Sequence, residues 1–217
     1  ITGKTPELWR ADSATQTPLS YRSENGMTVV PMDMAPQESV FVVFRTPTTA
    51  VSATVAAATW TPVATLANDW SLRFDGLAAP AAIQTGKLGS LTANTDPAIK
   101  YFSGTTTYTT QLTLPKDIKP GAPLKLDLGS VGDVAEVFVN GASAGIAWKA
   151  PYQVEVGALM HKGPNTIEVR VANLWVNRLI GDAQPGAQKV TFTAAPTYKA
   201  DAPLRPSGLI GPVTLLQ

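Results

Sequence analysis

The residues best suited to chemistry in this chain lie in one polar segment, residues 173–182, with the sequence Asn-Leu-Trp-Val-Asn-Arg-Leu-Ile-Gly-Asp. Its candidate ligand groups are Trp175, Asn177, Arg178 and Asp182. An indole ring can cover the C–H face of a pyranose, and planar amide and guanidinium groups can hydrogen-bond vicinal hydroxyls. This mixture of side chains indicates carbohydrate binding.

A structural role is the alternative for the same segment. Arg178 can pair with Asp182 or a backbone carbonyl and lock the segment against a neighbouring domain, with Trp175 as core filler. Such a loop must satisfy its backbone polar groups whether or not a ligand binds. Both interpretations remain open at this point.

Two further aromatic candidates, Trp148 and Tyr152, flank the turn Lys149-Ala150-Pro151. Trp148 continues the alternation of its strand with Ile146, which favours packing in the core. Contact with a sugar is the alternative for both rings.

Acidic residues elsewhere offer a weaker case for catalysis. Glu136 and Glu168 could serve as the two carboxylates of a glycosidase, which lie about 5–5.5 Å apart in retaining enzymes and about 6.5–9.5 Å apart in inverting ones. Nothing in their spacing predicts such a pair, and a solvated sheet face with cross-strand charge pairs explains them. We therefore expect no catalytic residues in this chain.

The elements that position these residues are strands. Residues 135–139 and 167–171 alternate apolar and polar with period two, as expected for strands with one buried face. Asn140-Gly141, which directly follows residues 135–139, is typical of a tight hairpin turn, because both central residues of such a turn take positive φ. No window sustains a helical stripe long enough for a substantial helix, so the chain is predicted to be all-β, with an antiparallel jelly-roll sandwich as its main domain.

Composition shifts divide the chain into three parts. Residues 1–47 read as the terminal strands of a preceding β domain, since the strand at 39–45 is apolar on both sides and belongs in the middle of a packed structure. Residues 48–59 read as a linker and residues 60–217 as the jelly-roll domain. In the last part we expect strands over residues 70–74, 105–114, 124–128, 135–139, 144–148, 153–156, 166–172, 190–194 and 213–216.

Composition and charge exclude several classes. Hydrophobic residues make up 44% and charged residues 15%, which favours a folded core over disorder. Seventeen basic and sixteen acidic residues give a net charge of +1, too balanced to attract nucleic acid. No apolar run approaches the ~20 residues of a spanning helix, so membrane insertion is not expected.

Metal binding is limited to oxygen ligands. Cysteine is absent, which excludes disulfides and thiolate sites, and His161 is the only histidine. Asn68-Asp69 and residues 94–96 (Asn-Thr-Asp) are rich in oxygen and could hold a structural Ca²⁺. The same residues suit ordinary Asx turns, and both interpretations remain open.

Several motifs occur in a characteristic order between residues 99 and 213. They are Ile99-Lys100-Tyr101-Phe102-Ser103-Gly104, Leu126-Asp127-Leu128-Gly129, Val137-Phe138-Val139-Asn140-Gly141, Gly145-Ile146-Ala147-Trp148, Pro151-Tyr152, the segment 173–182, and Pro206-Ser207-Gly208-Leu209-Ile210-Gly211-Pro212-Val213. In this order they resemble the C-terminal region of bacterial α-L-rhamnosidases of glycoside hydrolase family 106. More loosely, the segment resembles the galactose-binding-like domain of family 2 β-glycosidases.

The resemblance implies a non-catalytic region of a larger glycoside hydrolase. In that family the catalytic carboxylates belong to an upstream barrel domain, which would be the partner of this chain, with a rhamnoside or other glycan as a second partner. It also implies a periplasmic or secreted location. The start at Ile1 without an initiator Met indicates a fragment or mature piece. An independent carbohydrate-binding or cell-surface adhesion module is the alternative.

Overall fold

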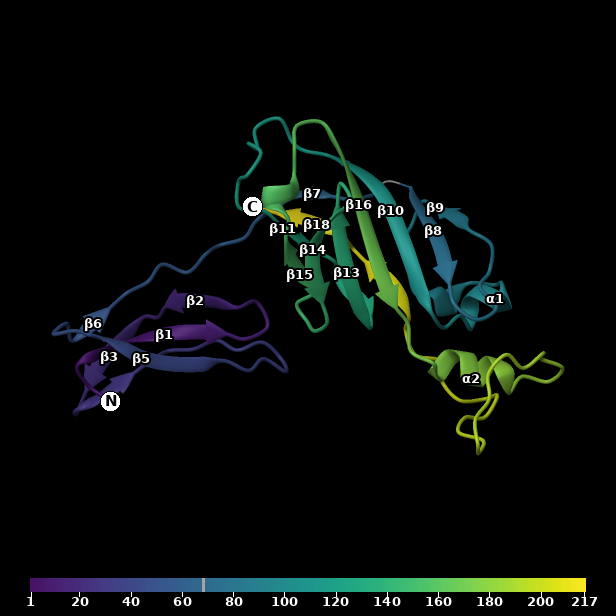
Figure 1. The fold of residues 1–217 in the computed structure, drawn as a ribbon, viewed down its shortest axis with the longest axis horizontal. Coiled ribbons are helices and arrows are strands. Elements are labelled where there is room, and N and C mark those ends of the chain that lie inside the picture. Colours follow the sequence, from purple (N-terminus) through teal and green to yellow (C-terminus); the bar gives the residue numbers. More distant parts are fainter. Residues whose placement is uncertain (68) are drawn as a thin grey trace. The chain divides into compact units, whose positions relative to one another are not determined.

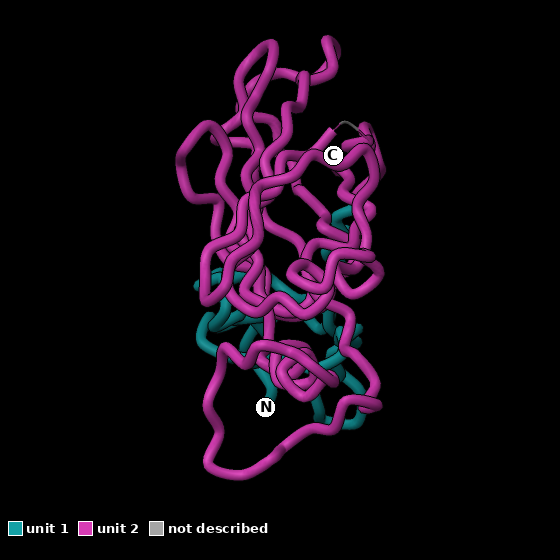
Figure 2. Tube along the Cα trace, turned by 90° about the vertical axis from the view of Figure 1, so that its right-hand side faces the viewer, with its two compact units in different colours: residues 1–59 teal, residues 60–217 magenta. Residues whose placement is uncertain are grey.

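The computed structural model describes residues 1–67 and 69–217, and the chain divides into two compact units, residues 1–59 and residues 60–217 (Figure 2). In the described residues, no helix has the length and apolar character needed to span a bilayer.

The first unit is built from two small antiparallel sheets. One sheet has the order β2-β1-β5 and the other the order β4-β3-β6. Their strands are β1 (Lys4–Arg10), β2 (Thr15–Pro18), β3 (Tyr21–Glu24), β4 (Met27–Val29), β5 (Phe41–Pro47) and β6 (Ser52–Ala53). Strand β5 lies at the edge of its sheet, and Phe41 is 63% exposed, so the predicted central position of this strand is not met within the unit.

The second unit contains a six-stranded sheet, a four-stranded sheet and a two-stranded sheet (Figure 1). The six-stranded sheet runs in the order β14 (Ala142–Ala147), β13 (Val134–Val139), β16 (Pro164–Ala172), β10 (Thr105–Thr113), β8 (Trp70–Asp75) and β9 (Ile83–Thr85). The four-stranded sheet runs β15 (Gln153–Glu155), β11 (Lys125–Asp127), β18 (Thr214–Leu216) and β7 (Pro62–Thr65), and the small sheet pairs β12 (Ser130–Gly132) with β17 (Gly208–Gly211). Short helices α1 (Pro97–Lys100), α2 (Val176–Asp182), η1 (Leu91–Ala93) and η2 (Gly157–Leu159) complete the unit.

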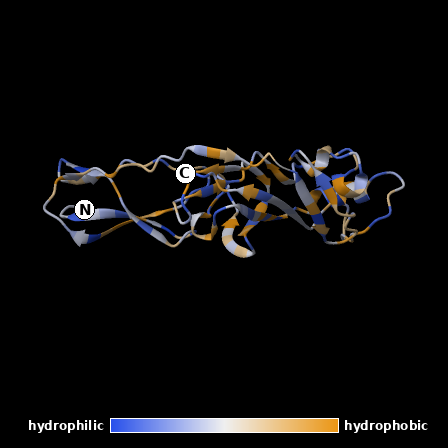
Figure 3. Cartoon of the chain, turned by 90° about the horizontal axis from the view of Figure 1, so that it is seen from above, coloured by the Kyte–Doolittle hydropathy of each residue, from blue (hydrophilic) through white to orange (hydrophobic). Residues whose placement is uncertain are grey.

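One apolar core joins the two larger sheets, and apolar residues recur along their strands (Figure 3). The six-stranded sheet contributes alternate residues such as Trp70, Val137 and Val169, while the four-stranded sheet contributes Leu126 and Leu215, all nearly inaccessible to solvent. Because both sheets bury one face in the same core, the unit is a β-sandwich. The predicted all-β, antiparallel sandwich is confirmed.

The predicted hairpin is present between β13 and β14. Asn140 and Gly141 have φ values of 53° and 83°, as the tight turn requires. The Asn140 side chain also donates to the Leu159 carbonyl and to Asn165 Oδ1, at 3.0 and 2.9 Å. The turn is therefore tied to the start of the neighbouring strand β16 and to the residues just before it.

Two predicted elements differ from the structure. Residues 190–194 form no strand, because the Val190 and Thr191 N–H groups donate to the Asp182 carboxylate instead of to a neighbouring strand. The polar segment that was predicted as a loop contains the seven-residue helix α2. Helix α2 and the chain that follows it extend beyond the ends of the strands (Figure 1).

Candidate functional site

The candidate segment begins at Asn173, directly after β16, where its buried side chain joins three parts of the sandwich. Asn173 Nδ2 donates to the Gly104 carbonyl at 3.0 Å and to Thr106 Oγ1 at 3.1 Å, and Asn173 Oδ1 accepts from the Gly208 N–H at 2.7 Å. These bonds connect the end of β16 to β10 and to β17. The direction in which the chain leaves the sheet is thereby fixed.

Asn177 is almost completely buried, and its side-chain amide forms two hydrogen bonds with the backbone of a single residue, Arg205. Its Nδ2 donates to the Arg205 carbonyl at 2.7 Å, and its Oδ1 accepts from the Arg205 N–H at 2.9 Å. Both faces of the amide are used within the chain. Asn177 therefore fastens helix α2 to the segment that returns to β17.

Arg178 and Asp182 form a buried ion pair on helix α2, with 2.7 Å between Arg178 Nη2 and Asp182 Oδ1. The contact is an ion pair without the alignment of a hydrogen bond, and Arg178 Nε has no hydrogen-bond partner among the described residues. The second carboxylate oxygen, Asp182 Oδ2, accepts from the N–H groups of Val190 and Thr191, at 3.2 and 2.8 Å. It also accepts from Thr191 Oγ1 at 2.5 Å.

These surroundings act on the pKa of Asp182 in opposite directions. Burial raises the pKa and is the largest single effect, whereas the three hydrogen bonds from Thr191 and Val190 and the charge of Arg178 lower it. The lowering effects together prevail, so the pKa lies below its ordinary value. Asp182 is thus held as a carboxylate that organises the following loop.

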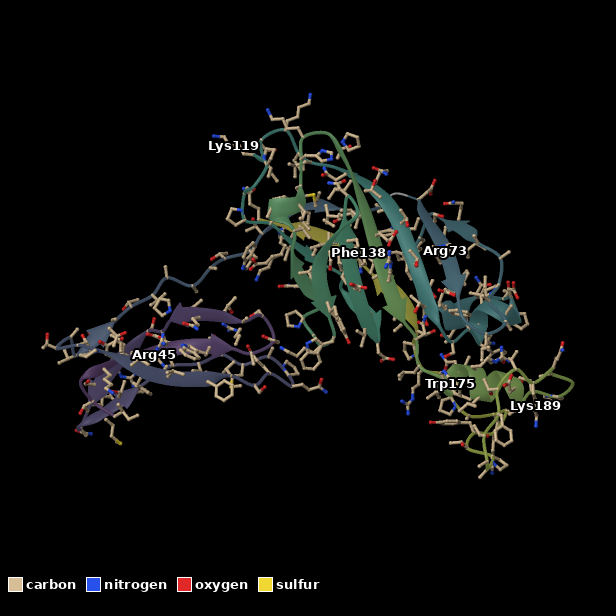
Figure 4. All side chains as sticks on the ribbon, viewed as in Figure 1. Arg45, Arg73, Lys119, Phe138, Trp175 and Lys189 are labelled. Atoms are coloured by element: carbon tan, nitrogen blue, oxygen red, sulfur yellow. The ribbon has the colours of Figure 1, made fainter. Side chains whose placement is uncertain are left out.

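Trp175, at the N-terminal end of α2, is the one aromatic member of the segment and is 54% exposed (Figure 4). Leu174 beside it and Phe192 in the following loop are also exposed. The polar members of the predicted constellation are thus used to build a support, and the support presents apolar side chains to the outside. Sugar binding by Trp175, Asn177, Arg178 and Asp182 stays a prediction.

The second aromatic pair divides between surface and core. Tyr152 is half-buried and packs against the core of the sandwich. Trp148 is 52% exposed, so the prediction that it packs in the core is wrong. The register explains the difference: Ala147 faces the core opposite Ala135, while Ile146 lies opposite the outward residue Glu136. Within the described residues, no hydrogen bond or ring contact joins Trp148 or Tyr152 to helix α2.

The outer face of the six-stranded sheet carries a groove that the sequence did not indicate. Strand pairing sets Ile146, Glu136, Arg170, Thr107 and Arg73 side by side across β14, β13, β16, β10 and β8. All five line a groove of about 520 Å³. Figure 4 labels Arg73, and also Phe138, which lines an adjoining groove of about 440 Å³. Arg170 belongs to both grooves and joins them.

The carboxylates on this face do not form an enclosed pair. Glu168 is bound to Arg170, with 2.6 Å between Glu168 Oε1 and Arg170 Nη2, and the same guanidinium lies 4.1 Å above the ring of Phe138. Glu136 lies on the neighbouring strand, opposite Arg170 in the register. Glu168 and Arg170 both belong to β16, so the ion pair on this open sheet face lies within one strand and is not the predicted pairing of charges across strands.

Two of the residues considered for calcium, Asn94 and Asp96, are engaged in local turns. Asn94 Oδ1 accepts from the Asp96 N–H at 2.9 Å, and Asp96 Oδ1 accepts from the Ala98 N–H at 2.9 Å, where it caps α1. Asn68 lies outside the described residues. Across residues 1–67 and 69–217, no three His, Cys, Asp or Glu side chains gather into a metal-binding group. The side chains of Asn94 and Asp96 therefore make the bonds of Asx turns, and calcium binding stays a prediction.

No family model matches the sequence. Over its whole length, however, the chain is 51% identical to part of the rhamnosidase from Novosphingobium sp. PP1Y, with a TM-score of 0.92, and it covers 21% of that structure's chain. The predicted resemblance to a rhamnosidase is confirmed. This rhamnosidase-like chain is also 34% identical over 176 residues to a putative β-glucuronidase of Formosa agariphila, a match that covers 69% of this chain and 15% of the relative.

The chain thus spans about a fifth or less of the length of these two proteins, and the similarity gives it a glycoside hydrolase context. A β-glucuronidase from an uncultured Clostridium sp. has a TM-score of 0.53 at 20% identity, over 75% of this chain and 30% of its own. At that identity the rhamnosidase-like chain shares the fold alone with it.

Proposed function

We propose that this chain is a non-catalytic β-sandwich region of a rhamnosidase-type glycoside hydrolase. It supports a catalytic domain elsewhere in the same protein and contacts carbohydrate. In this proposal residues 60–217 are a galactose-binding-like jelly roll, residues 1–47 are strands of a preceding β domain, and the protein is periplasmic or secreted. The observation that carries the proposal is the match of the entire chain, at 51% identity, to one fifth of a rhamnosidase.

The surroundings of the acidic residues support the absence of catalysis. The Asp182 carboxylate forms an ion pair with Arg178 and accepts hydrogen bonds from Thr191. The Glu168 carboxylate forms an ion pair with Arg170. A glycosidase needs two carboxyl groups that flank the scissile bond, one of them protonated and ready to donate. The ion-paired carboxylates of Asp182 and Glu168 do not meet that need, and Glu136 lies on an open sheet face.

Helix α2 supplies the surface by which the chain contacts the rest of the hydrolase. Three partly buried hydrogen-bonded anchors hold it: Asn177 to Arg205, Asp182 to Thr191, and Gln184 Nε2 to the Ala200 carbonyl at 2.8 Å. Apolar residues that stay exposed on a rigid support are typical of interfaces, and an aromatic ring is a frequent anchor of binding energy. We therefore assign Leu174, Trp175 and Phe192 to this contact.

Association between separately produced parts tests this proposal. The 217-residue chain is expected to bind the remainder of its hydrolase in solution. Trp175→Ala should weaken that binding tenfold or more, because it removes the aromatic anchor. Trp148→Ala is the matched control, since it removes another half-exposed indole from the same unit, and it should leave the affinity within twofold. Measurement is by analytical ultracentrifugation or calorimetric titration, and absence of association with wild-type chain refutes the supporting role.

The alternative, an independent carbohydrate-binding or adhesion module, is favoured by the exposure of both Trp148 and Trp175. Exposed indole rings are common sugar-stacking groups. In the same association experiment this alternative predicts no binding to any other part of a hydrolase.

A further inference from the structure

We propose that the groove on the outer face of the six-stranded sheet is a binding site for a neutral saccharide, with Arg73, Thr107 and Glu136 meeting the hydroxyl groups and Ile146 and Trp148 covering an apolar edge of a sugar ring. The choice of a saccharide rests on the proposed function. The location of the site rests on the geometry of the sheet.

Strand register builds the floor of the groove. Thr107 pairs with Arg170 on one side and with Arg73 on the other, and it is only 5% exposed although it points to the outer face. It therefore lies between two long basic residues on the neighbouring strands. Thr105 pairs in the same way with Ala172 and with Asp75, which puts a second hydroxyl one row further along the groove.

Two charged side chains of the groove have no side-chain partner among the residues that the structure describes. Among the described residues, neither Arg73 nor Glu136 takes part in an ion pair or side-chain hydrogen bond. Their neighbour Arg170 is held by Glu168. A free guanidinium can donate two parallel hydrogen bonds and a free carboxylate can accept two, which suits vicinal hydroxyls. The groove therefore offers a donor and an acceptor on opposite sides of the Thr107 hydroxyl.

The charge of the groove selects among ligand classes. Its lining contains two basic residues, Arg73 and Arg170, and two acidic residues, Asp75 and Glu136, so its formal charge is zero. A site for nucleic acid or a sulfated polysaccharide needs an excess of positive charge to displace counterions. Balanced charges favour an uncharged ligand rich in hydroxyl groups.

Large apolar side chains border the same groove. Val134 and Ile146 line it and are exposed. Trp148 is not itself a lining residue, but it is also exposed and follows Ile146 by two positions, just beyond the end of β14. Ile146 is 59% exposed, an unusual state for isoleucine on a strand that has a core beneath it. Next to unpaired hydrogen-bonding groups, such a border fits the C–H face of a pyranose.

Titration of the full 217-residue chain with methyl α-L-rhamnopyranoside and with a short neutral rhamnose oligosaccharide tests the site. We expect millimolar affinity, detected by saturation-transfer NMR and measured by calorimetry. Trp148→Ala and Arg73→Ala should each weaken binding tenfold or more, whereas Trp175→Ala, the same truncation on helix α2, should change it less than twofold. Circular dichroism confirms that each variant keeps the fold.

Three results would overturn the site. Absence of binding by the wild-type chain removes it and leaves the supporting role intact. Loss of binding in Trp175→Ala with retention in Trp148→Ala moves carbohydrate recognition to helix α2. Tight, salt-sensitive binding of heparin shows a site for polyanions. Failure of the supporting role itself appears in the association experiment, so the two proposals can fail separately.

Discussion

Replacing Asp182 by alanine is expected to lower the free energy of unfolding of the second unit by about 3–5 kcal/mol, the range for breaking one partner out of a buried ion pair. The change leaves the buried Arg178 guanidinium without its counter-charge. It also removes the acceptor for Thr191 and Val190. The loop that follows helix α2 thus loses its main anchor.

Urea unfolding followed by circular dichroism measures the loss, and limited proteolysis reports whether residues 183–207 open first. Asp201→Ala is the matched control, because Asp201 is exposed in the same loop, and it should change stability by less than about 0.5 kcal/mol. Equal stabilities of the Asp182 and Asp201 variants would contradict the role of this carboxylate.

The Asp182 carboxylate also makes the stability of the fold depend on pH. Because the folded pKa of Asp182 lies below its ordinary value of 3.8, the carboxylate stabilises the fold at pH values above 3.8, and this contribution is lost as the pH falls through the lower, folded pKa. The stability difference between wild type and Asp182→Asn should therefore be constant near neutral pH and shrink below pH 3.8.

Asn173→Ala is expected to cost about 3 kcal/mol or more. It leaves the Gly208 N–H and the Thr106 hydroxyl without a partner inside the sandwich, and each buried group that loses its hydrogen bond costs about 1–3 kcal/mol. Asn94→Ala, which removes an exposed turn bond to Asp96, is the control and should cost less than about 1 kcal/mol. Urea midpoints compare the two variants, and similar midpoints would show that Asn173 is no structural hub.

The sandwich could be predicted from the sequence where a local pattern determines the structure. The alternation in β13 and β16 reports which face is buried, and Asn140-Gly141 carries the φ values of the turn in its residue types. Both features depend on residues within a few positions of each other. No knowledge of distant contacts is needed for either.

Helix α2 and its loop could not be predicted because distant residues hold them. The helix has only seven residues, too few for a recognisable helical stripe, and its stability comes from anchors such as Arg205, 28 positions away from Asn177. The apparent strand at 190–194 failed for the same reason, since its N–H groups were already used by Asp182.

The groove could not be predicted from the sequence, because its residues come together only through the register of the paired strands. Arg73, Thr107 and Arg170 are far apart in the chain and meet only when β8, β10 and β16 pair. Trp148 was assigned to the wrong face because Ile146 suggested an inward position. Strand β14 pairs with β13 with a register shift between Val137 and Phe138, and in this pairing the small residues Gly145 and Ala147 face the core. Ile146 and Trp148 are therefore exposed.

The central claim, that the chemistry of the hydrolase proposed as the parent protein takes place outside this chain, is tested most directly by rhamnoside turnover. The 217-residue chain and the longer protein to which we assign it are compared on an aryl α-L-rhamnoside at equal molar concentration. We predict that the longer protein releases the aryl alcohol and that the chain alone shows no release above the uncatalysed rate. Release by the chain alone that is abolished by Glu136→Gln would contradict this claim.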